Sequence, residues 1–377
     1  MDFELRPRTV LLTLAGSRAY GLHTADSDLD LKGVAIATAP YYHGCLRHFE
    51  QADRPTHMAA FLADLHAHER AVAEATKLEG TVYEVRKFLN LALEANPNIL
   101  DVLFCRDDEV RLLTPAGARM RAARDLFLSA RCKHTFSGYA AAQLKRIRGH
   151  RRWLLDPPKA PPRRADYGLP DQTLIPADQL AAAAEAVKKR MDAWCIDYGT
   201  LGEAEKIAIE AQIATALTEI GLGNDEARWV AAARHVGIDD NLMLVMQRER
   251  TYESAARDWR QYQEWRRNRN PARAALEERY GYDCKHGAHL VRLLRMGREI
   301  LTTGQVHVWR GGIDADELLA IRQGAWTYDR LVSWAEAEDD ALEKLYRTGP
   351  VAVPKQPDRT AVDQLCVDLV EEALRAS

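Results

Sequence analysis

Two short apolar runs near the N-terminus predict two buried β-strands. Residues 9–15 (TVLLTLA) are apolar and are followed by a Gly-Ser pair, which is typical of a buried strand that ends at a turn. Residues 29–37 alternate in polarity and contain β-forming residues, so they predict a second strand. Between the runs, residues 18–23 (RAYGLH) predict a short helical turn and residues 25–28 (ADSD) predict a turn.

Helical spacing dominates most of the remaining chain. After Gly80, apolar residues recur at helical spacing from Val82 to Ala92, and the Asn-Pro-Asn that follows predicts the end of that helix. Residues 99–104 predict another short helix, whereas residues 40–76 match no single pattern. Further apolar stripes predict helices at residues 180–194, 209–220, 252–262, 331–334 (with Thr327 as the cap) and 362–369.

These patterns predict an α+β chain. A length of 377 residues suits two domains, or one domain with a large appendage. We expect an N-terminal domain with strands over residues 1–125, and a mainly α-helical domain over residues 126–377. Residues 156–164 (DPPKAPPRR) predict a loop or a stiff connector.

The distribution of charge is more informative than its sum. The formal net charge is only -3, so the overall charge indicates no particular partner. Residues 131–164, in contrast, are dense in Arg and Lys and contain Asp156 as the only acid. Such a segment favours a local site for a polyanion on a molecule that is nearly neutral.

The cysteines and the apolar segments favour a cytoplasmic setting. The six cysteines are scattered without a Cys-x-x-Cys pair, which argues against a zinc module or a disulfide framework. The first residues lack the apolar core of a secretory signal. No segment approaches the ~18 uninterrupted apolar residues of a membrane span. We therefore expect a cytoplasmic protein that does not cross a membrane.

Two aspartates at the start of the second strand are the first candidate for chemistry. The period of a strand places Asp28 and Asp30 on the same face, where their charges repel each other. A hard divalent cation such as Mg²⁺ between them would relieve that repulsion. Two such ions about 3.5–4 Å apart can activate a hydroxyl and stabilise a leaving pyrophosphate, a site that normally needs a third carboxylate.

The Gly-Ser pair supplies a complementary feature. Gly16 allows the backbone to approach a phosphate closely, and Ser17 adds a hydroxyl beside the N–H groups that begin the short helix. An Asp-x-Asp pair also occurs in ordinary surface turns, and Asp26 is interpreted only as a turn cap. The functional interpretation is favoured because Gly-Ser ends one apolar strand and the aspartates begin the next.

Residues 16–34 (GSRAYGLHTADSDLDLKGV) resemble the active-site signature of the DNA polymerase beta nucleotidyltransferase superfamily. Within it, they resemble the narrower RNA-repair-pathway, polymerase-beta-like family. Residues 81–104, 136–154 and 285–301 resemble further blocks of that family. The resemblance implies an N-terminal nucleotidyltransferase domain with a mixed β-sheet, followed by a larger helical domain, with the active site in a cleft between them.

The resemblance also assigns roles to residues. It implies that Gly16 and Ser17, with Arg18 beside them, hold the phosphates of a nucleoside triphosphate. It implies that Asp28 and Asp30 bind two Mg²⁺ or Mn²⁺ ions. The third carboxylate of the superfamily usually lies on a neighbouring strand just before a helix, and Glu79 occupies the expected place. Its rival, Glu84, falls inside the predicted helix.

Two groups of cations are candidates for binding substrates. Lys145, Arg148 and Arg152 share one helical face and can bind nucleic-acid phosphates, with Tyr139, His150 and Trp153 available for stacking on bases. A solvated basic face, or a set of cations that binds only the triphosphate, is the alternative.

The second group is in residues 285–301. Lys285, His289 and Arg292 follow at i, i+4 and i+7 and can clamp a triphosphate, unless they form an ordinary exposed face. His66 and His68 are interpreted as surface histidines.

The expected reaction is metal-dependent transfer of a nucleoside monophosphate from a nucleoside triphosphate to a hydroxyl, with release of pyrophosphate. The first choice of acceptor is an RNA end or another nucleic acid. A protein or small-molecule acceptor, a template-directed polymerase and a non-catalytic nucleotide sensor are the alternatives. The preferred nucleotide and the oligomeric state do not follow from the sequence.

Overall fold

The computed structural model describes residues 2–25, 27–173, 176–192, 225–269 and 271–375. The chain splits into two compact units. Unit 1 comprises Met1–Arg151 and Ala272–Ser377, and unit 2 comprises Arg152–Pro271. The division at residue 125 that the sequence suggests stays a prediction.

Unit 1 contains one mixed β-sheet. Its strands are β1 (Thr9–Ala15), β2 (Leu29–Ala35), β3 (Gln51–Ala52), β4 (Leu78–Glu84) and β5 (Val110–Leu113). Their order is β3-β4-β2-β1-β5. β2 and β4 pair in parallel, whereas β1 pairs antiparallel with both β2 and β5. The sheet confirms the predicted mixed architecture and the first two predicted strands.

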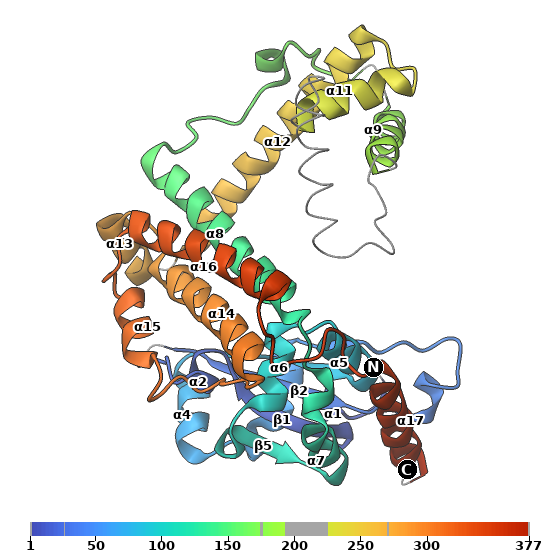
Figure 1. Ribbon diagram of the computed structural model, residues 1–377, viewed down its shortest axis with the longest axis vertical. Helices are drawn as coiled ribbons and strands as arrows, with labels where there is room; N and C mark the ends of the chain where they lie inside the picture. The colour runs from blue at the N-terminus through green and yellow to red at the C-terminus, as the bar shows by residue number, and fades with distance from the viewer. Residues whose placement is uncertain (1, 26, 174–175, 193–224, 270, 376–377) are drawn as a thin grey trace. The chain divides into compact units, whose positions relative to one another are not determined.

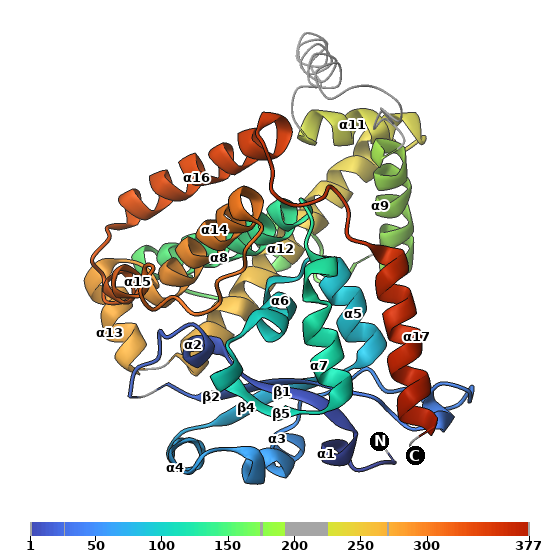
Figure 2. The same ribbon diagram turned by 60° about the horizontal axis from the view of Figure 1, so that its bottom comes forward.

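Both faces of the sheet are covered, as Figure 2 shows, with α5, α6 and α7 on one face and α3 and α4 on the other. Leu29 and Leu31 of β2 point into the core on the α3 side together with Phe61. Because side chains alternate along a strand, Asp30 and Lys32 point to the opposite face. The polar residues of β2 therefore face the side that is covered by α6 and α14.

Figure 1 labels the helices of unit 1 in the order of the chain, where there is room. They are α1 (Leu5–Arg8), α2 (Gly16–Ala19), α3 (Pro55–Met58), α4 (Ala67–Ala75), α5 (Val85–Leu93), α6 (Pro97–Phe104), α7 (Pro115–Ala122), α14 (Cys284–Thr303), α15 (Ala315–Arg322), α16 (Tyr328–Thr348) and α17 (Arg359–Arg375). α8 (Cys132–Leu155) begins in unit 1 and α13 (Pro271–Tyr280) returns the chain to it.

One predicted boundary is wrong. The helix expected from Val82 begins at Val85, because Val82 is still a buried residue of β4. Glu84 ends that strand and caps α5, where its carboxylate accepts hydrogen bonds from the backbone N–H groups of Arg86 (2.9 Å) and Lys87 (3.2 Å). The short predicted helix at residues 99–104 is confirmed as α6.

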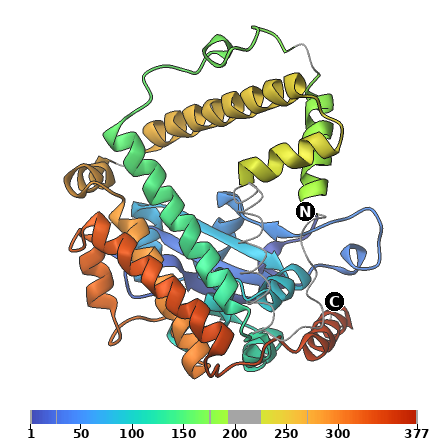
Figure 3. The same cartoon turned by 45° about the horizontal axis from the view of Figure 1, so that its top comes forward.

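The C-terminal part of unit 1 is helical, as predicted. Thr327 caps α16 by accepting a hydrogen bond from the N–H of Arg330 (3.2 Å). α14 packs against α15 and α16. Phe136 of α8 contacts α14 at Gly297, where a Cβ atom would lie 3.1 Å from the Phe136 side chain. Figure 3 shows the green α8 running beside the orange helices α14 and α16.

Unit 2 has a small core of its own. Its helices α9 (Ala177–Asp192), α11 (Asp225–His235) and α12 (Asp240–Asn268) contribute Val187, Trp229 and Met243 to that core. The predicted stripe at residues 209–220 and Trp194 lie outside the described residues. None of the helices in the described part of the chain is both long and apolar enough to span a membrane.

The close contact between β2 and β4 at Gly80 can be tested. A Cβ atom on Gly80 would lie 2.5 Å from the carbonyl oxygen of Leu31 and 2.6 Å from the sulfur of Met58. We expect Gly80→Ala to lower the free energy of unfolding by about 1–3 kcal/mol, because the overpacked strand must shift. Urea denaturation measures this change.

Gly138→Ala is the matched control. A Cβ atom on Gly138, in the second turn of α8, meets nothing within 4 Å. Alanine should raise stability there by up to about 1 kcal/mol through helix propensity alone. Equal unfolding midpoints for the two variants would contradict the packing described for Gly80.

Candidate active site

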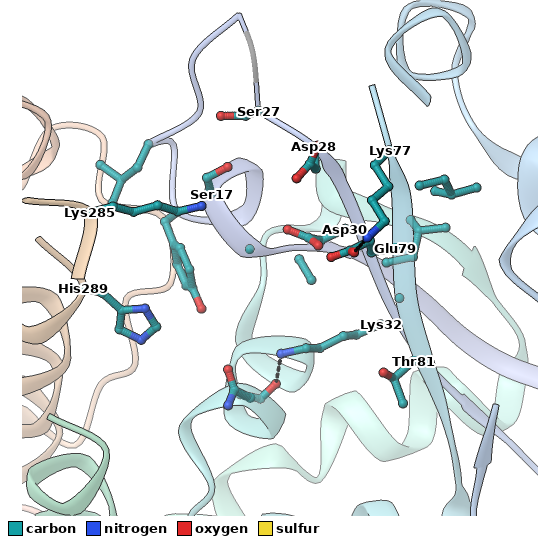
Figure 4. A pocket seen from close by; sticks show the side chains of 18 of the residues that line it. Ser17, Ser27, Asp28, Asp30, Lys32, Lys77, Glu79, Thr81, Lys285 and His289 are labelled. Carbon is teal, nitrogen blue, oxygen red and sulfur yellow. Dashed lines mark hydrogen bonds and ion pairs between the residues drawn. The ribbon is translucent and has the colours of Figure 1, made fainter. Parts of the chain in front are cut away.

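A cavity of about 690 Å³ lies within unit 1. One wall is formed by the turn after β1 and by the N-terminal parts of β2 and β4, and the other by α14 and α15. Figure 4 shows acidic side chains on the strand wall and the side chains of Lys285 and His289 across from them. A cavity of this size accommodates a nucleotide-sized ligand.

Three carboxylates line the strand wall: Asp28, Asp30 and Glu79. Asp28 immediately precedes β2 and is exposed, while Asp30 is half-buried and pairs in register with Glu79 of β4. Burial, and then the charge of Glu79, raise the pKa of Asp30. The surroundings of Asp30 therefore disfavour its ionised form, and a bound cation would stabilise that form.

The Gly-Ser turn lies directly against Asp30. Gly16 has a φ of +59°, and a Cβ atom there would lie 2.1 Å from Oδ2 of Asp30. Only glycine combines this left-handed backbone with such a close approach. Ser17 lines the same cavity. The two motifs that the sequence separates by a dozen residues are thus in contact.

Arg18, unlike Gly16 and Ser17, is not among the residues that line the cavity. Its guanidinium donates a hydrogen bond to the carbonyl oxygen of Ser27 (3.2 Å). Ser27 lies in the loop just before Asp28. The geometry therefore shows Arg18 tethering the loop that presents Asp28.

The helical wall carries the predicted Lys–His–Arg stripe. Lys285, His289 and Arg292 all line the cavity from α14. Arg292 is buried, with its guanidinium 3.6 Å from the centre of the Tyr20 ring and 3.3 Å from Nε2 of His289. Burial, and then the charge of Arg292, lower the pKa of His289 to about 3. His289 is neutral at physiological pH, so this stripe places its positive charges at Lys285 and Arg292.

Several residues of the cavity did not emerge from the sequence. Lys32 follows Asp30 on the same face of β2 and donates a hydrogen bond to the carbonyl oxygen of Asn98 (3.1 Å). The period of the strand could have identified Lys32. Asp53 and Arg322 also line the cavity, and no local pattern indicates either.

The structure separates the two candidates for the third carboxylate. Glu79 faces the cavity, where Lys77 forms an ion pair with it. Glu84 is buried at the other end of β4, where it caps α5 and accepts a hydrogen bond from the hydroxyl of Tyr42 (2.9 Å). The position of Glu79 agrees with the predicted assignment, and its role in catalysis stays a prediction.

The donors on the strand wall fit a hard divalent cation. Carboxylate oxygens are the ligands that Mg²⁺ and Mn²⁺ prefer. Among the described residues, two other groups bring three potential ligand atoms within 4.8 Å of one another: His66, His68 and Glu69, and His150, Asp283 and His286. The three carboxylates on the strand wall do not form such a group, so at least two of them lie more than 4.8 Å apart.

Residues 4–154 match the model of the RNA repair pathway DNA polymerase beta family. The resemblance noted in the sequence is therefore confirmed over these residues, which include the whole acidic wall. The polymerase-beta-like family implies nucleotidyltransferase activity. Residues 285–301 lie outside the match. No curated protein and no solved structure matches the chain significantly.

The family match also covers the basic face predicted on α8. Lys145, Arg148 and Arg152 are all exposed. Arg148 pairs with Glu336 (2.7 Å) and Arg152 pairs with Asp258. Exposed ion pairs contribute only about 0–1 kcal/mol, so a polyanion can displace them.

The aromatic residues near this face are packed into the protein. Trp153 is buried, with its ring 5.5 Å from that of Trp265. The hydroxyl of Tyr139 accepts a hydrogen bond from the side-chain amide of Asn96 (2.9 Å). His150 is half-buried beside Asp283. The predicted stacking surface is therefore occupied largely by internal packing.

The raised pKa of Asp30 predicts a pH-dependent effect on stability. An acid with a raised pKa in the folded state contributes stability below its unfolded pKa of about 4, and that contribution is lost as pH rises through the folded pKa. An Asn side chain does not ionise, so Asp30→Asn avoids this loss of stability. Without divalent cations, its melting temperature should therefore exceed that of the wild type at pH 7. The gap should close below about pH 4.

Asp178→Asn on α9 is the control for this experiment, since Asp178 is exposed. Substitutions at exposed positions usually change stability by less than about 0.5 kcal/mol. Melting curves of both variants, taken from about pH 3.5, just below the ordinary pKa of an Asp carboxyl, to about pH 8, measure this difference. A wild type as stable as Asp30→Asn at pH 7 would argue against the electrostatic strain at Asp30.

Proposed function

We propose that the protein transfers a nucleoside monophosphate from a nucleoside triphosphate to a hydroxyl group in a reaction that depends on divalent cations. The observation that carries the proposal is the contact between the Gly16 backbone and the carboxylate of Asp30. Asp30 of β2 lies beside Glu79 of β4 in the register of the two strands. A seat for phosphate and a set of metal ligands thereby share one wall of a cavity.

The opposite wall supports the same reaction. Lys285 and Arg292 place positive charge across the cavity from the carboxylates, where they can hold the β- and γ-phosphates. Neutral His289 can donate or accept a hydrogen bond there. Ser17 can donate its hydroxyl proton to a phosphate oxygen. These contacts would position the α-phosphate near the acidic wall.

Asp28, Asp30 and Glu79 would hold two Mg²⁺ or Mn²⁺ ions. Bound there, the ions supply the positive charge that lowers the pKa of an attacking hydroxyl and stabilises pyrophosphate. The hydroxyl oxygen forms a bond to the α-phosphorus while the bond from that phosphorus to the bridging oxygen breaks. The hydroxyl proton leaves to a carboxylate or to water, and pyrophosphate departs.

An RNA end is the first choice of acceptor. The family match and the exposed basic face of α8 both support a nucleic-acid substrate. A protein or small-molecule acceptor is the second candidate, because the largely internal packing of Trp153 and Tyr139 leaves few aromatic rings for base stacking on this face. A sensor that only binds nucleotides would not need the electrostatic strain at Asp30.

Labelling decides both the activity and the acceptor. We expect label from one or more of four α-labelled nucleoside triphosphates to appear on RNA when Mg²⁺ or Mn²⁺ is present. Asp28→Asn and Asp30→Asn should each lower the rate by at least about 100-fold, because even outer-shell partners of metal ligands contribute 10–100-fold. Asp178→Asn, at an exposed position on α9, is the control and should keep the wild-type rate.

Two outcomes would change the proposal. Turnover retained in either active-site variant would contradict a metal-ligand role for that aspartate. Label on protein rather than on RNA would replace the first acceptor with the second.

The basic face of α8 predicts the salt dependence of RNA binding. Each contact with a phosphate of single-stranded RNA contributes about -0.7 to the slope of log K against log salt concentration. Reversing the charges of Lys145, Arg148 and Arg152 to Glu should therefore weaken binding and make the slope shallower by about 2. The control reverses Lys188 and Lys189, which are exposed on α9. Equal slopes for the α8 variant and the wild type would count against this face.

A further inference from the structure

Two histidines meet a buried aspartate where α14 begins. Asp283 is fully buried and is the N-cap residue of α14, His286 lies in the first turn of that helix, and His150 reaches them from α8. All three residues belong to unit 1. None of them lines the cavity of the candidate active site.

The two oxygens of Asp283 face different groups. Oδ1 accepts a hydrogen bond from the backbone N–H of His286 (3.1 Å), which caps the helix. Oδ2 lies 3.6 Å from Nε2 of His286 and 3.8 Å from Nδ1 of His150. Hydrogen bonds between such atoms are usually about 2.7–3.2 Å long. The arrangement instead approaches the separation of about 3.3 Å between two donors on one tetrahedral metal ion.

We propose that His150, Asp283 and His286 bind one divalent transition-metal ion of the Zn²⁺ class. Two imidazole nitrogens and one carboxylate oxygen are a common donor set for such ions, whereas Mg²⁺ prefers oxygen donors alone. The carboxylate is already held in place by its capping bond. The donor sets of this site and of the acidic wall select different ions.

The site has a structural consequence for the basic wall. A metal ion held by His150 and His286 would cross-link α8 to the first turn of α14. Lys285 precedes His286, and His289 follows it by one turn on the same helix. The ion would therefore fix the helix that presents the positive side of the cavity, without taking part in the chemistry.

The other cluster that contains two histidines offers a contrast. His66 and His68 are exposed, and the carboxylate of Glu69 is bound by Arg111 and by the N–H of His66. That carboxylate is already neutralised by a buried guanidinium. The pair is therefore a matched control with the same ligand types and a different environment.

Zinc binding tests the proposal on the full-length chain without a histidine tag. The protein is titrated with Zn²⁺ against a chromophoric chelator in excess Mg²⁺, which occupies carboxylate sites, and bound zinc is counted by mass spectrometry. We expect one Zn²⁺ per chain and a higher melting temperature when it is bound. His150→Gln, His286→Gln and Asp283→Asn should each raise Kd by more than about 10-fold, since loss of an outer-shell partner alone has that effect.

The controls separate this site from the others. His68→Gln and Asp30→Asn should bind zinc as the wild type does. Zinc affinity that is unchanged in all three ligand variants, or that is lost in Asp30→Asn, would overturn the proposal. X-ray absorption of the zinc-loaded wild type needs no variant: imidazole scattering supports the site, and an oxygen-only shell refutes it.

Discussion

The candidate site depends on the contact between the backbone of Gly16 and the carboxylate of Asp30. A side chain at position 16 would occupy the space of Oδ2 of Asp30, and the left-handed backbone there disfavours any other residue. This contact fixes the end of β1 against the start of β2. The position of Asp30 then determines which residue of β4 stands beside it, because the two strands pair in register.

Opposite charges on two walls explain much of the remaining arrangement. On the strand wall, burial, and then the charge of Glu79, raise the pKa of Asp30. On the helical wall, burial, and then the charge of Arg292, lower the pKa of His289 until the ring is neutral. A ligand that carries phosphates and divalent cations would place charges of opposite sign against both walls. These charges support the proposed nucleoside triphosphate substrate.

The local part of this site could be predicted from the sequence, and the remote part could not. The strand, the Gly-Ser turn and the Asp-x-Asp pair lie within a short segment, where period and turn chemistry are reliable guides. Glu79 needed the family resemblance, since no local pattern marks it as a metal ligand. Arg322 comes from a helix some 300 residues away, as its hydrogen bond to the carbonyl oxygen of Leu22 shows, and no spacing rule links such positions. The helix predicted from Val82 began too early, because a buried strand that runs directly into a helix leaves its apolar residues at spacings that suit both.

The discontinuity of unit 1 has a consequence for its biosynthesis. All three carboxylates of the acidic wall have been translated by residue 79, but the basic wall requires α14 and α15, which are translated only after Arg152–Pro271. A nascent chain thus carries its cluster of carboxylates for most of translation without the opposing cations of Lys285, Arg292 and Arg322. The cavity can close around a ligand only late in synthesis, so the order of translation itself delays the assembly of the complete pocket until nearly the whole chain has emerged.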